Sequence, residues 1–132
     1  MAGVLPRDYV PGQKLRIEVY RRLARLRDPA TLADFRQELR DRYGPTPEPV
    51  EWLLRTTEVR LLCVQWKIAG IHRDGRDLIF SYRDAEMAKR VAAASRGRMK
   101  VVDEKSIYLR LRENEDKPEA MYRLLGSVLQ TA

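Results

Sequence analysis

The 132-residue chain contains little of the side-chain chemistry on which most catalytic sites depend, with one cysteine and one histidine. A single cysteine excludes an internal disulfide and is typical of a reducing compartment, so we expect a cytoplasmic protein. No apolar run approaches the roughly 20 residues of a membrane-spanning helix, and the N-terminus lacks the basic-then-apolar layout of a signal peptide. We therefore expect a soluble protein that has no membrane partner.

The lack of paired catalytic groups argues against an enzyme. His72 lies beside a predicted turn and has no neighbouring serine or cysteine to activate, so we interpret it as an ordinary strand residue. Cys63 lies among apolar residues of a predicted helix, which indicates a buried thiol rather than a reactive one. A Gly-rich phosphate loop and a His/Cys cluster with metal-ligand spacing are both missing. The sequence therefore predicts no catalytic residue, no cofactor and no metal site.

An excess of basic residues makes nucleic acid a candidate partner, because the net charge is +7. Residues 67–112 hold 12 basic and 6 acidic side chains, and residues 1–44 hold 10 and 6. The two signs are interleaved along both segments. This pattern is typical of a solvated mixed-sign surface with a basic middle, and not of a polybasic tail.

The order of apolar periods predicts an α+β fold in a single domain, residues 1–132. Pro6 and Pro11 oppose helix, so residues 1–13 are predicted to be an extended lead-in. A helical half, residues 14–69, follows with three helices. The first is expected at 14–27 and the second at 29–43, and the third covers about 20 residues from Thr46-Pro47, with apolar positions from Val50 to Ile68.

The second helix carries clear boundary signals. Asp28 precedes Pro29 as an N-cap precedes a first-turn proline, and Thr31 with Asp34 offers a competing cap. Gly44 is placed to end the helix. Its predicted buried side chains are Leu32, Phe35, Leu39 and Tyr43.

In the remaining residues, 70–132, the period changes to that of a small antiparallel sheet with two further helices. Asp74-Gly75 favours a hairpin turn between strands near 71–73 and 77–82. Asp84 is placed to cap a short helix. The further elements are expected at 84–95 (helix), 99–102 and 107–111 (strands), and 117–129 (helix).

An acidic stripe on the second helix points to protein interaction. Asp34, Glu38 and Asp41 have i, i+4 and i+7 spacing, which places them on one face beside the apolar stripe. Arg42 flanks this face. Such a ridge on a basic domain suits docking against arginines of a partner. The alternative is that Glu38 and Arg42 form a surface ion pair within their own helix, and the residues alone leave both interpretations open.

A basic cluster before the third strand is the candidate nucleic-acid contact. Arg96, Arg98 and Lys100 could neutralise phosphates, with a binding constant that depends strongly on salt. No recognition helix or aromatic stacking motif accompanies them. The sequence therefore favours protein interaction over nucleic-acid binding, and the second function stays as the alternative.

Two motifs in residues 5–50 are typical of one protein family. The first is LPRDYVPGQKLRIEVYRRLA, from Leu5 to Ala24, and the second is ELRDRYGPTPEPV, from Glu38 to Val50. In this order and spacing they resemble the C-terminal domain of bacterial transcription-repair coupling factors. Beyond residue 66 the resemblance is one of element order. The positions that match the family pattern are Pro6, Tyr9, Pro11, Tyr20, Arg22, Leu23, Ala24, Asp41, Arg42, Tyr43, Gly44, Pro45 and Pro47.

The resemblance implies a regulatory domain of an ATP-driven DNA translocase whose motor lies outside this chain. By this resemblance the domain packs onto the UvrB-like module of the same parent protein, masks the surface that recruits UvrA, and restrains the motor until RNA polymerase is engaged. UvrA and RNA polymerase would then be indirect partners, and DNA would be reached through the parent protein.

We hypothesise that the docking contact is made by Glu38, Asp41 and Arg42, with Asp34 extending the acidic stripe. The remaining motif residues are interpreted as structural, either fixing the turn (Tyr43, Gly44, Pro45, Pro47) or belonging to the core (Tyr9, Tyr20, Leu23).

Overall fold

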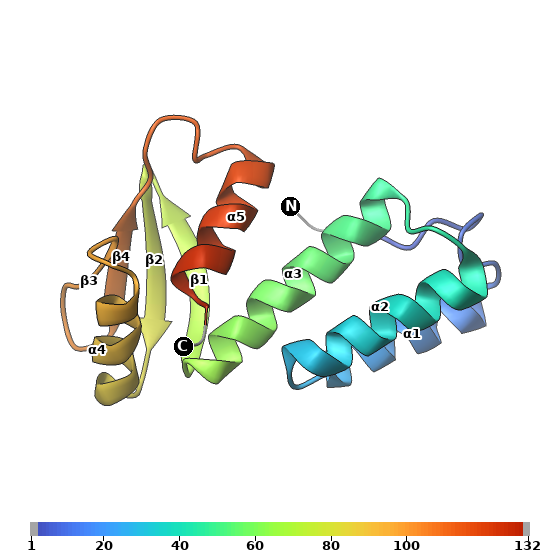
Figure 1. Ribbon diagram of the computed structural model, residues 1–132, viewed down its shortest axis with the longest axis horizontal. Helices are drawn as coiled ribbons and strands as arrows, with labels where there is room; N and C mark the ends of the chain where they lie inside the picture. The colour runs from blue at the N-terminus through green and yellow to red at the C-terminus, as the bar shows by residue number, and fades with distance from the viewer. Residues whose placement is uncertain (1–2, 131–132) are drawn as a thin grey trace. The chain divides into compact units, whose positions relative to one another are not determined.

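The computed structural model describes residues 3–130, and these residues have the predicted α+β architecture (Figure 1). Three N-terminal helices precede a four-stranded antiparallel sheet with two further helices. The elements are α1 (Gln13–Arg25), α2 (Pro29–Tyr43), α3 (Glu48–Gln65), β1 (Ile68–Asp74), β2 (Asp77–Tyr82), α4 (Ala85–Ala94), β3 (Met99–Val101), β4 (Ser106–Arg110) and α5 (Pro118–Val128). The chain forms two compact units, Met1–Leu61 and Leu62–Ala132.

Helix α2 begins and ends where its sequence signals predict. The Asp28 carboxylate accepts the backbone N–H of Thr31 at 2.8 Å, and Pro29 occupies the first helical position. The competing Thr31 cap is not formed, because the Thr31 hydroxyl donates to the Asp28 carbonyl instead. The helix ends at Gly44, whose φ of 92° lies where residues with a Cβ are strained.

The sequence predicted an extended N-terminal lead-in, and this prediction is wrong. The lead-in folds into a turn. The backbone N–H groups of Tyr9 and Val10 both donate to the Pro6 carbonyl, at 3.2 and 3.1 Å. Leu5 and Val10 are buried in the core of the first unit. Since proline opposes helix but favours turns, Pro6 is compatible with this outcome.

The core of the first unit is built from one face of each helix and from the lead-in turn. Tyr20 was predicted to belong to the core, but 40% of it is exposed, so that prediction is wrong. Its hydroxyl accepts the backbone N–H of Leu5 at 2.9 Å. Tyr43 is only half-buried. The buried members are Leu5, Val10, Val19, Leu23, Leu32, Phe35, Leu39, Val50, Leu54 and Leu61.

Helix α3 is shorter than the apolar repeat predicted. It ends at Gln65, and the left-handed backbone of Lys67 (φ 57°) turns the chain into β1. Ile68 is therefore the first strand residue and not the last apolar position of the helix, and Val64 is 53% exposed. Ile68 is buried, and a buried apolar residue fits the end of a helix as well as the start of a strand. Its hydrophobicity alone could therefore not decide between the two.

The sheet of the second unit has strand order β1-β2-β4-β3, with every neighbouring pair antiparallel (Figure 1). Asp74 pairs with Asp77, so Gly75 and Arg76 form the predicted hairpin turn, and Gly75 has a φ of 63°. Buried residues on the central strands β2 and β4 supply the sheet's share of the core, namely Leu78, Ile79, Phe80, Tyr82, Ile107 and Leu109.

Two capping or closing contacts hold the helices of the second unit. The Asp84 carboxylate accepts the Met87 N–H at 3.0 Å and caps α4, as predicted. The indole N–H of Trp66 donates to the carbonyl of Leu129, just after α5, at 2.7 Å, and both residues are buried. Cys63 is also buried, and this burial raises the pKa of its thiol to about 11, as expected for an unreactive cysteine.

We predict that Trp66→Phe lowers the free energy of unfolding by about 1–3 kcal/mol, because it leaves the buried Leu129 carbonyl without its donor. Urea unfolding measures the change. Tyr108→Phe is the matched control, since the Tyr108 hydroxyl makes no hydrogen bond within residues 3–130, and it should change the value by less than about 0.5 kcal/mol. Equal losses in both variants would show that the indole contact contributes nothing specific.

Candidate protein-interaction surface on helix α2

The turn that follows α2 is fixed from the lead-in by Tyr9. Its hydroxyl donates to the carbonyl of Gly44 at 2.8 Å and lies 3.4 Å from that of Leu39. The Tyr9 and Tyr43 rings pack at a centroid distance of 5.8 Å. These contacts confine the last turn of α2 and explain why the tyrosines and the glycine occur together in the sequence motif.

An ion pair fixes the same turn from α3. The Arg36 guanidinium nitrogen Nη1 lies 2.7 and 2.6 Å from the two carboxylate oxygens of Glu51, and the Thr46 hydroxyl donates to the same carboxylate. Burial alone would raise the pKa of Glu51. The hydrogen bonds from Thr46 and Arg36, together with the positive charges of Arg36 and Arg40, outweigh burial and hold this pKa below its ordinary 4.5.

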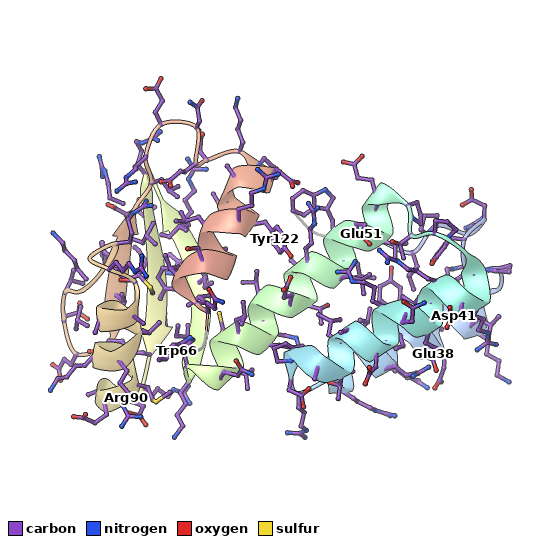
Figure 2. The ribbon with its side chains drawn as sticks, viewed as in Figure 1. Glu38, Asp41, Glu51, Trp66, Arg90 and Tyr122 are labelled. Atoms are coloured by element: carbon purple, nitrogen blue, oxygen red, sulfur yellow. The ribbon has the colours of Figure 1, made fainter. Side chains whose placement is uncertain are left out.

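The predicted acidic stripe lies on the exposed side of α2. Asp34, Glu38 and Asp41 are all exposed, and Figure 2 shows Glu38 and Asp41 near the C-terminal part of the helix. Neither Asp34 nor Asp41 forms an ion pair with any residue in the range 3–130, and Asp41 accepts one hydrogen bond from Gln37 at 2.9 Å. We call these three carboxylates the acidic ridge.

Glu38 has a cationic partner, but it is not Arg42. The Glu38 carboxylate pairs with Arg22 of α1, and their side chains are 51% and 44% exposed. The Arg42 guanidinium instead lies 5.3 Å from the centre of the Tyr43 ring, as in a cation–π contact. The alternative of a Glu38–Arg42 pair within one helix is therefore wrong, and Arg42 stays exposed at the end of the ridge.

A narrow groove between α1 and α2 borders the ridge. Its volume is about 30 Å³, so it is a surface crease and not a ligand cavity. Both charged and apolar side chains line it: Leu15, Glu18, Val19, Arg22, Phe35, Glu38, Leu39, Arg42 and Tyr43. A partner's side chain could therefore meet a carboxylate and an aromatic ring side by side.

The predicted basic cluster is only partly available to a ligand. The guanidinium of Arg98 forms a two-pronged pair with Glu115, at 2.7 and 3.0 Å, and is mostly buried. These bonds come first among the causes that lower the pKa of Glu115. Arg96 and Lys100 are exposed. Arg96 lies in a turn and has a left-handed backbone conformation, and Lys100 lies on β3.

Arg96, Arg98 and Arg112 line an open concavity of about 940 Å³ in the second unit. Ser95, the C-cap of α4, and Val128, the last residue of α5, line it as well. Helix C-termini carry partial negative charge, which attracts arginines and opposes phosphates. The concavity is therefore less suited to a phosphate than its arginines alone suggest.

Metal-ligand clusters were one kind of site to look for in residues 3–130. No group of three or more His, Cys, Asp or Glu side chains in that range is arranged to hold a metal ion. His72 is exposed on β1, as its interpretation as a strand residue expects. None of the helices described is long and apolar enough to cross a membrane.

Sequence reasoning missed Arg22, Arg36 and Glu51 as members of this region. Arg22 and Arg36 are bonded to residues 16 and 15 positions away, and no helical period relates such pairs. Glu51 carried no such signal either, because it lies five residues after Thr46 and a capping box needs a spacing of three.

Three helices, a four-stranded antiparallel sheet and two further helices define an α+β domain, and helix α2 of this domain carries the acidic ridge. A crystal structure described as the C-terminal domain of transcription-repair coupling factor has this fold, with a TM-score of 0.75 and 15% identity, over 98% of this chain and 84% of that one. The sequence model of the TRCF domain family matches residues 1–93. The chain therefore belongs to this family, whose members are parts of transcription-repair-coupling factors.

Curated relatives agree with this assignment. The transcription-repair-coupling factor of Mycobacterium bovis is 46% identical over 59 residues, which cover 45% of this chain. That of Rickettsia bellii is 31% identical over 88 residues, or 66% of the chain. The matches span only 5% and 8% of those proteins, so the chain corresponds to a small part of their length. The resemblance inferred from the two motifs is confirmed.

Glu51→Gln should lower the free energy of unfolding by about 1–3 kcal/mol near neutral pH, because it removes one charged partner from a mostly buried pair. The folded-state pKa of Glu51 is lowered, so its contribution is present above the ordinary pKa of 4.5 and is lost as the pH falls through the folded value. Urea unfolding of both proteins at several pH values should therefore show a difference that shrinks in acid.

Glu48→Gln is the control for this series, since Glu48 is an exposed carboxylate in the same helical turn as Glu51. Its effect should stay within about 0.5 kcal/mol at neutral pH. A Glu51→Gln loss that is equally large above and below the titration range would contradict the assigned role of the ion pair.

Proposed function

We propose that the chain is a non-catalytic regulatory domain that docks through its acidic ridge onto the UvrB-like module of its parent protein. In the docked state it would mask the surface that recruits UvrA and restrain the motor. RNA polymerase engagement would release it. This proposal extends the family assignment, which by itself gives the domain type and its repair context.

The observation that carries the proposal is the pair of uncompensated carboxylates on a rigidly held helix. Asp34 and Asp41 are exposed and lack a basic partner within residues 3–130. The helix is held at its C-terminal end by Tyr9 and at its middle by the Arg36–Glu51 pair. Charges preorganised in this way favour an arginine-bearing partner because little conformational freedom is lost on binding.

Weak individual contacts suffice for such a clamp. Exposed ion pairs contribute about 0–1 kcal/mol each, but a domain joined to its target by a chain experiences an effective concentration in the millimolar range. The docked state can thus dominate while the interface stays easy to open. A ligand that binds the open state more tightly then shifts the equilibrium toward release.

Asp41→Arg should weaken binding of this chain to the UvrB-like module about tenfold or more, since it places a positive charge at the C-terminal end of the ridge, against the arginines of the partner. The melting temperature should change little because Asp41 is exposed. Calorimetric titration with the module measures the affinity. Unchanged affinity would contradict the proposal.

Glu104→Arg provides the matched control, because it makes the same charge change at an exposed position in the loop between β3 and β4. It should bind the module like the unmodified chain. If it weakens binding as much as Asp41→Arg does, the loss reflects net charge and the ridge is not the docking surface.

Binding to duplex DNA through Arg96 and Lys100 is the alternative function, and the exposure of both side chains keeps it testable. It predicts binding with a steep salt dependence that the double variant Arg96→Ala/Lys100→Ala reduces. Measured in parallel, DNA binding in the absence of any affinity for the module would replace the docking proposal.

A further inference from the structure

We infer that Arg22 is an internal competitor for the partner's guanidinium at Glu38, and that it sets an upper limit on the docking affinity. The inference rests on the proposed docking function and deepens it. It identifies the ligand of this part of the ridge as an arginine side chain, and it gives Arg22 a role distinct from that of the carboxylates.

The contacts of Arg22 are those that an arginine from a partner would make. Its guanidinium pairs with the Glu38 carboxylate, and its Cζ atom lies 4.6 Å from the centre of the Phe35 ring. An ion pair and a cation–π contact at the same point favour a planar guanidinium over a lysine ammonium. Arg22 therefore occupies a small arginine subsite formed by Phe35 and Glu38.

The subsite is open to exchange because it lies at the surface. The side chains of Arg22 and Glu38 are 44% and 51% exposed, and exposed pairs of this kind hold together weakly. The shallow groove beside them is lined by charged side chains as well as by Phe35 and Tyr43, so an incoming guanidinium would meet both kinds of group there. Rotation of Arg22 into water would free both the carboxylate and the ring face.

The other two ridge positions lack such a competitor. Asp34 and Asp41 form no ion pair within residues 3–130, so a partner's basic group can meet them directly. Glu38 alone must first exchange its arginine. This difference would keep docking weak enough to reverse, which suits a clamp that has to open when the motor is engaged.

The test is the affinity of the Arg22→Ala chain for the UvrB-like module. Binding should become about two- to fivefold tighter, the range expected when a weak exposed ion pair no longer has to be broken. Arg25→Ala is the control, because Arg25 is an exposed arginine one turn further along α1 and the ion pair of Glu38 is with Arg22. It removes the same charge and should bind less tightly than Arg22→Ala.

A double variant separates competition from a general charge effect. In a Glu38→Gln background, Arg22→Ala should no longer tighten binding, since the carboxylate for which the two arginines compete is gone. Persistence of the gain in that background would overturn the inference. So would weaker binding of Arg22→Ala alone, which would make Arg22 part of the interface or a support for Glu38.

These outcomes are distinct from failure of the proposed function. If the module binds and Asp41→Arg abolishes binding, but Arg22→Ala changes nothing, docking stands and the competitor role falls. If the module does not bind the unmodified chain under any salt condition, both fall together. Urea unfolding of Arg22→Ala should confirm that the variant folds, because the pair it loses is exposed.

Discussion

The geometry of the first unit depends on the turn between α2 and α3, which is held from two sides. Tyr9 bonds the Gly44 carbonyl from the lead-in, and the Arg36–Glu51 pair joins α2 to the first turns of α3. Gly44 can adopt its backbone conformation without strain, whereas a residue with a Cβ could not. The motif from Glu38 to Val50 therefore stabilises the fold of the first unit. The same contacts also fix the position at which the helix bearing the acidic ridge ends.

Charge is arranged differently in the two units. In the first unit, two ridge carboxylates are exposed without basic partners among residues 3–130, while the Arg36–Glu51 pair is mostly buried. In the second unit, Arg98 is engaged by Glu115, and the arginine-lined concavity lies at helix C-termini. The net charge of +7 therefore does not describe how charge is distributed in either unit.

Local signals predicted the elements of the fold well. The caps at Asp28 and Asp84 and the turn at Gly75 depend on side chains and dihedral angles only a few residues apart, so sequence alone identifies them. The predictions failed where distant residues decide. Ile68 fits both a helical and a strand pattern. The turn of the lead-in is stabilised by the burial of Leu5 and Val10 in the core of the first unit.

The acidic stripe itself was predictable because helical spacing places its members on one face. The partner of Glu38 was not, since Arg22 reaches it from another helix. We propose that the chain recognises its partner through the ridge on α2. The most direct test of this proposal is a map of amide chemical shifts in this 15.4 kDa chain during titration with the UvrB-like module. If the ridge is the docking surface, the perturbed amides should concentrate in residues 15–22 and 34–43. Perturbations confined to residues 96–112 would contradict it.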